Sequence, residues 1–174
     1  MVAPTPPEAW LRGPLPGIEP ALMPAAHALV QARDDLTAGL ADAIDTELWA
    51  RPGGAAAAGF HVRHLAGSLD RLLTYARGER LSPAQVAALG REGETGIGAA
   101  ELGRIASTAI DRALDQIRQT PTSTLGEIRP VGRAGLPATV LGLLVHAAEH
   151  ASRHTGQFLT TLKIVRGLGA VPPA

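Results

Sequence analysis

The side chains most able to do chemistry in this sequence are histidines that gather in two short stretches. His146, His150 and His154 recur at spacing four, and His61 and His64 form a second group. In a helix, a spacing of four advances about one turn and drifts roughly 40°, so successive members point the same way. A neutral imidazole is a common metal ligand, and a site built on one such pair needs a ligand from elsewhere. We therefore expect the two stretches to meet around a metal ion.

The apolar pattern around the later group sets the direction of its side chains. His154 falls on an apolar stripe between Ala151 and Phe158, and His150 borders that stripe. Both are expected at the interior or its rim, where an unpaired imidazole costs free energy. Hydrogen-bonded core histidines are one explanation, but five histidines on two helical faces favour a metal site. His27 lies one step off its own stripe, so we interpret it as a partly exposed helix residue.

Composition excludes several classes of protein. The chain has 174 residues, and its 16 basic and 16 acidic side chains give zero net charge. That balance argues against a nucleic-acid or anionic-membrane binder, so neither is an expected partner. There is no cysteine, so any thiol chemistry must bring its thiol on the substrate. Neither a signal peptide nor a membrane-spanning segment is evident, and a cytoplasmic location is expected.

Helical periodicity and breakers predict an all-α chain that forms a four-helix bundle. Residues 1–20 contain six prolines and should form an extended N-terminal arm, either attached through Trp10 and Leu11 or loose. Residues 21–168 should form a single domain. A short connecting helix should begin at Ser82-Pro83. No strand is expected, and residues 122–136 should form an irregular connection. The four long helices are expected at residues 21–44, 57–77, 99–119 and 137–166, with Gly167 ending the last.

Two chemical interpretations follow from the histidines themselves. Residues 146–150 match the H-x-x-E-H pattern of inverted zinc proteases, with Glu149 as a base, but the pattern is short and the chain has no sign of a substrate-cleft sheet. Three imidazoles instead leave open positions on a divalent ion, which is typical of a catalytic or ligand-binding site. Zn, Ni, Mn and Fe all suit imidazole, and the sequence does not separate them.

The motifs His64-Leu65-Ala66-Gly67-Ser68-Leu69-Asp70 and His150-x-x-x-His154-x-Gly156-Gln157 resemble the DinB/YfiT-like family. The resemblance covers the whole chain in helix order and spacing. It implies a four-helix bundle with up-down-down-up connectivity, commonly dimeric, and a divalent metal held by His64, His150 and His154. This chain adds His61 and His146, one turn from a ligand on each face, so both are expected near the metal as supporting or alternative ligands.

The same resemblance implies metal-dependent transferases that use low-molecular-weight thiols such as bacillithiol, mycothiol or glutathione, or a related isomerase. A metal-dependent hydrolase is also compatible with the ligand set. Arg63, Arg71 and Arg153 are candidates for binding a carboxylate on such a thiol, although each could be a solvated helix arginine. The alternative function is a non-catalytic metal-binding or stress-response bundle. A homodimer through helix faces is expected from the family and from the Ala/Leu-rich composition.

Overall fold

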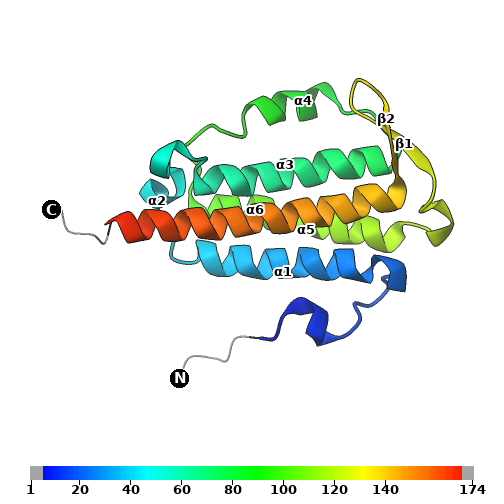
Figure 1. Cartoon of the computed structure of the whole chain (residues 1–174), viewed down its shortest axis with the longest axis horizontal. Coiled ribbons are helices and arrows are strands. Elements are labelled where there is room, and N and C mark those ends of the chain that lie inside the picture. Colours follow the sequence, from blue (N-terminus) through cyan, green and yellow to red (C-terminus); the bar gives the residue numbers. More distant parts are fainter. Residues whose placement is uncertain (1–5, 170–174) are drawn as a thin grey trace.

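The computed structural model describes residues 6–169 and is predominantly helical, as predicted. Four long helices lie side by side: α1 (Met23–Leu40), α3 (Ala58–Ala76), α5 (Ala99–Gln119) and α6 (Val140–Gly169) (Figure 1). Helices α1 and α6 run in one direction, and α3 and α5 run in the opposite direction (Figure 1). Two short helices, α2 (Asp45–Trp49) and α4 (Pro83–Gly90), lie in the connections. None of the described helices is both long and apolar enough to cross a membrane.

The buried side chains follow the predicted apolar stripes. Helix α3 packs against α5 and α6, and α1 packs against the same two helices, so one core runs between the four. Phe158, Leu65 and Leu144 are fully buried in it. Burial of such side chains supplies the main stabilisation, since each contributes about 1.5–3 kcal/mol relative to exposure. The packing that positions the histidines of α3 and α6 therefore comes mainly from apolar side chains.

The predicted start of the short connecting helix is confirmed. Ser82 caps α4 by accepting a hydrogen bond from the Gln85 backbone N–H at 3.2 Å, and Gln85 Oε1 accepts from the Ser82 N–H at 2.8 Å. Such a reciprocal capping box satisfies two N–H groups that a helix start leaves unpaired. The capping box fixes the residue at which α4 begins. The start of α4 in turn sets the position of the loop that follows it, which lies beside α3.

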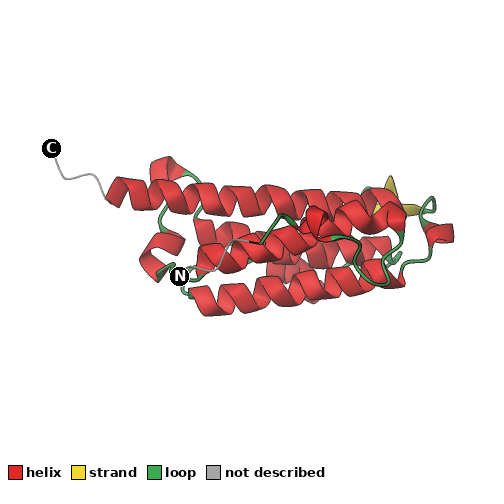
Figure 2. Ribbon diagram, turned by 90° about the horizontal axis from the view of Figure 1, so that it is seen from below, coloured by secondary structure: helices red, strands yellow, loops and turns green. Residues whose placement is uncertain are grey.

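The expectation of no strands was wrong. Strands β1 (Ile128–Val131) and β2 (Leu136–Thr139) form an antiparallel hairpin at one end of the helical body (Figure 2). Pro130 faces Pro137 in its register. Proline argues against a strand because it cannot donate a ladder hydrogen bond, but two facing prolines are tolerated where the pair exchanges none. The hairpin places Pro137 in β2, so α6 begins at Val140 instead.

The two chain ends also differ from prediction. Helix α6 continues through Gly167 to Gly169. A glycine costs little near a helix end, and Arg166 also ties the last turns of α6 to Glu47 and Asp42 through ion pairs of 3.0 Å each. Trp10 and Leu11 do not attach the arm, since their exposed fractions are 62% and 57%. The neighbouring Ala9 is buried there instead, within a single 3-10 turn, Ala9–Arg12. Residues 1–5 of the predicted arm lie outside the described range.

Candidate metal centre

Three histidines converge where α3 packs against α6. His64 comes from α3, and His150 and His154 come from successive turns of α6. Each offers one ring nitrogen, and these three atoms lie within 4.8 Å of one another. His64 Nε2 is 3.1 Å from His150 Nε2, and the His154 ring centroid is 4.5 Å from both other rings. The structure thus brings together the three residues that the resemblance implied.

This spacing fits a bound divalent ion. Two nitrogen ligands about 2.0–2.1 Å from a tetrahedral zinc ion lie roughly 3.3 Å apart. The His64–His150 separation of 3.1 Å is close to that value, so small side-chain movements would complete the set. Nδ1 of His150 is buried without a partner among the described residues, so hydrogen bonds within the protein do not satisfy the whole cluster.

Electrostatics favour the neutral form of the His150 and His154 rings. Burial, followed by the nearby His64 and His150, lowers the pKa of His154 from 6.5 to about 4. Burial also lowers the pKa of His150, with His64 the next contributor. A neutral ring presents a lone pair, whereas a protonated one repels a cation. His150 and His154 are therefore ready to bind metal without first losing protons.

A buried carboxylate supports His64 from the far side of the ring. Glu92 is 5% exposed, and its Oε2 lies 2.6 Å from His64 Nδ1, while its Oε1 accepts a hydrogen bond from Arg71 at 2.6 Å. A carboxylate in this position accepts Nδ1–H and leaves the Nε2 lone pair free for a metal. Gly67 makes room for it, since a β-carbon there would collide with Glu92 Oε1. Sequence reasoning missed Glu92 because it lies in a loop without periodicity.

The additional histidines separate into one inside the cluster and one at its edge. His61 is 7% exposed, and its Nδ1 lies 3.1 Å from His154 Nδ1, so one ring donates and the other accepts. The His146 side chain is 51% exposed and pairs with Glu149 at 3.2 Å. His146 is therefore near the cluster, with its ring centroid 5.5 Å from that of His150, but neither His146 nor Glu149 is among the converging residues. His27 is elsewhere, 2.9 Å from the Gly13 carbonyl.

In a comparison with family models, residues 28–158 match a model described as the DinB superfamily. The match spans most of the chain and contains all three converging histidines. This chain belongs to the DinB superfamily. A comparison with curated proteins finds no match.

The three candidate arginines of this DinB-superfamily protein have different surroundings. Arg153 lines a hollow of about 530 Å³ beside α6, together with His61, Gly156 and Gln157. It also pairs with Glu149 in an ion pair whose side chains are 52% and 48% exposed, and such a surface pair contributes little free energy, so a ligand can replace it. Arg71 is occupied by Glu92 and by Ser68 Oγ at 3.2 Å, so it supports the centre and does not face a ligand. Arg63 lines a different cleft, between α3 and α5. Arg153 is thus the arginine best placed to meet a molecule that approaches the histidines from the hollow.

Replacing Glu92 with glutamine should weaken zinc binding about tenfold. The amide keeps the shape but carries no charge, so His64 becomes a weaker ligand and the charged partner of Arg71 is lost. Zinc affinity would be measured by competition with a chromophoric chelator. Glu94→Gln is the matched control, because Glu94 lies in the same loop but does not contact His64. Equal weakening in both variants would remove Glu92 from the site.

The metal-free protein should lose stability as the pH falls from about 6.5 to about 4. The folded-state pKa of His154 lies below its ordinary 6.5, so the unfolded chain binds the proton first and stability falls across that window, levelling off below it. For His154 the loss is on the order of 3 kcal/mol. Urea unfolding across this pH range would measure it.

The control for this pH effect is a pair of glutamine variants. His154→Gln should reduce the pH dependence, and His27→Gln should retain it, because His27 lies outside the cluster. An unchanged pH dependence in His154→Gln would contradict the buried, neutral state of that ring.

Proposed function

We propose that this DinB-superfamily protein holds one divalent ion on His64, His150 and His154 and acts as a metal-dependent enzyme on a small molecule. The observation that carries the proposal is the convergence of the three ring nitrogens within 4.8 Å. Transfer of a low-molecular-weight thiol is the favoured reaction, with hydrolysis as the related possibility. The ligand set suits Zn, Ni, Mn or Fe.

A divalent ion with three neutral ligands keeps its full double charge and would lower the pKa of a thiol or water at an open position. The chain's own residues prepare that position. Glu92 fixes the tautomer of His64, and His61 holds the ring of His154. Arg153 stands at the hollow beside His61, where its guanidinium can bind a carboxylate of the incoming molecule. The absence of cysteine fits a thiol that arrives as cosubstrate.

The proposal extends to the architecture of the family. The running directions of α1, α3, α5 and α6 in Figure 1 support an up-down-down-up four-helix bundle. We also expect the homodimer that the resemblance implies. Light scattering at micromolar concentration tests it, and a monomeric mass would reject it.

The activity test compares chelator-stripped and metal-loaded protein. Both forms would be offered a panel of small thiols together with an electrophilic acceptor, and conjugate formation would be followed by mass spectrometry. Metal-dependent conjugation, lost in His154→Ala, is the expected result. Equal background rates with and without metal across the common bacterial thiols would instead support the non-catalytic metal-binding alternative.

A further inference from the structure

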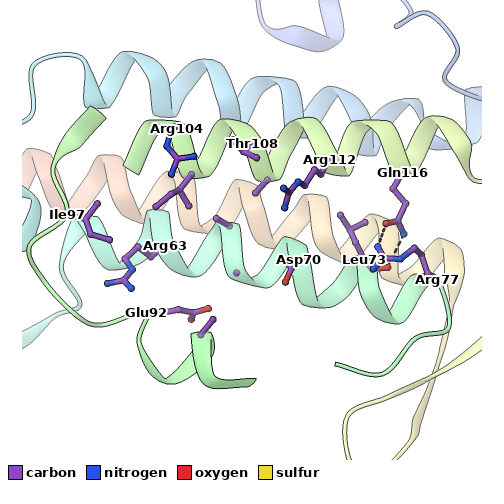
Figure 3. A pocket seen from close by; sticks show the side chains of 15 residues that line it. Arg63, Asp70, Leu73, Arg77, Glu92, Ile97, Arg104, Thr108, Arg112 and Gln116 are labelled. Atoms are coloured by element: carbon purple, nitrogen blue, oxygen red, sulfur yellow. Dashed lines mark hydrogen bonds between the residues drawn. The ribbon is translucent and has the colours of Figure 1, made fainter. Parts of the chain in front are cut away.

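A cavity lies away from the three histidines, between α3 and α5. It has a volume of about 700 Å³, within the range of small-molecule sites. Its roof comes from α4 and the chain that follows, through Ala88, Glu92 and Ile97 (Figure 3). The histidines at the proposed centre do not line it. Glu92, which holds His64 at that centre, does line it, so the cleft and the proposed centre share one side chain.

The cleft is rich in cationic side chains. Four arginines line it, against two carboxylates, Asp70 and Glu92. Both carboxylates are already engaged, since Glu92 binds Arg71 and His64 and Asp70 accepts from Gln85 at 2.8 Å. Glu92 thus has a charged partner outside the lining and Asp70 has a neutral one, and the four arginines outnumber the two carboxylates of the lining.

The spare positive charge is on α5. Arg104, Thr108 and Arg112 follow one another at spacing four along the wall that faces α3 (Figure 3). Arg112 makes no hydrogen bond or ion pair with any residue between 6 and 169. Among the described residues Arg104 pairs with Glu101 alone, and the two side chains are 66% and 47% exposed. Such a surface pair contributes little free energy, so an anionic ligand can replace Glu101.

The geometry of this row suits one anionic group. The α-carbons of Arg104 and Arg112 are separated by about 12 Å along the helix axis. Two arginine side chains are long enough to contact one anionic group placed between them. Thr108 lies midway and offers a hydroxyl donor. Guanidinium groups bind carboxylates through charge-assisted, often bidentate, hydrogen bonds.

The rest of the wall is apolar and small. Ile105 and Ala109 lie on α5 with the arginine row, and Ala66 and Leu73 of α3 together with Ile97 extend the apolar surface. A ligand that used both parts of the cleft would carry an anionic head and an apolar body. A bare inorganic anion would leave the apolar wall unused, and a neutral apolar molecule would leave the arginines without a partner.

We propose that the α3–α5 cleft binds a small amphipathic carboxylic acid, with its carboxylate on Arg104, Thr108 and Arg112 and its apolar body against Ala66 and Ala109. The probe is octanoate, titrated calorimetrically into the full-length, metal-free chain. Octanamide has the same body without the charge and should bind about tenfold more weakly or worse. Inorganic phosphate should bind more weakly than octanoate.

Two variants locate the site. Arg104→Gln/Arg112→Gln should weaken octanoate about tenfold or more, whereas Arg118→Gln/Arg133→Gln, which removes equal charge outside the cleft, should not. Ala109→Leu should weaken octanoate by filling the cleft without changing charge. Equal affinity of the wild type for octanoate and octanamide, or unchanged octanoate binding in folded Arg104→Gln/Arg112→Gln, would overturn the proposal. Phosphate binding as tight as octanoate would overturn the amphipathic class.

Discussion

Replacing His154 with alanine should lower zinc affinity about a hundredfold or more and leave the helices folded. Structural zinc sites with four ligands bind with roughly 10–16 kcal/mol, so each ligand accounts for about 3 kcal/mol, or about a hundredfold. His150→Ala should behave the same way. The fold should survive because α6 is held by apolar neighbours such as Leu144 and Ala151, which are almost fully buried.

Chelator competition gives the zinc affinities, and circular dichroism reports the helices. The matched control is His146→Ala, on the same helix and one turn before His150, because its side chain is half exposed and pairs with Glu149. If His146→Ala lost as much affinity as His154→Ala, the ligand set would need revision.

The largest stability effect should come from Phe158→Ala, with a loss of about 3–5 kcal/mol. Phe158 is fully buried where α6 meets α1, and the approach is so close that a β-carbon at Gly39 would lie 2.6 Å from its ring. Truncation removes the buried ring and leaves a cavity that rigid helices cannot fill. Urea unfolding monitored by circular dichroism measures the free energy of unfolding.

Ile164→Ala is the control for Phe158→Ala, because Ile164 lies on the same helix and is 48% exposed. It should change stability by less than about 1 kcal/mol. Zinc affinity of folded Phe158→Ala should stay near that of the wild type, since Phe158 contributes no ligand. A small stability loss for Phe158→Ala would mean that the α1–α6 contact is not part of the core.

The sequence predicted the helices well because their signals are local and repeated. The stripes of apolar residues, the cap at Ser82 and the pair His150 and His154 at spacing four are all readable within one or two turns. The hairpin was not predicted because Pro130 and Pro137 argue against strands. The two prolines are compatible with a hairpin because they face each other in its register. Its pairing is a contact between segments, which periodicity does not encode.

The candidate site divides in the same way. Local spacing and the family motifs gave His64, His150 and His154, but spacing could not distinguish His61 from His146, since each lies about one turn from a ligand. The difference is set by how α3 packs on α6, which buries one ring and leaves the other at the edge. The role of Glu92 could not be predicted from the sequence, because its contact with His64 depends on the path of the loop after α4 and on the space beside Gly67.

The most direct test of the central claim is a crystal structure of the zinc-loaded protein with anomalous data collected at the zinc edge. We predict one strong anomalous peak per chain, within about 2.0–2.1 Å of a ring nitrogen from each of His64, His150 and His154. Glu92 should remain hydrogen-bonded to Nδ1 of His64 and should lie outside bonding distance of the zinc ion. A peak at His146 and Glu149 instead, or no peak between α3 and α6 at full zinc loading, would contradict the account.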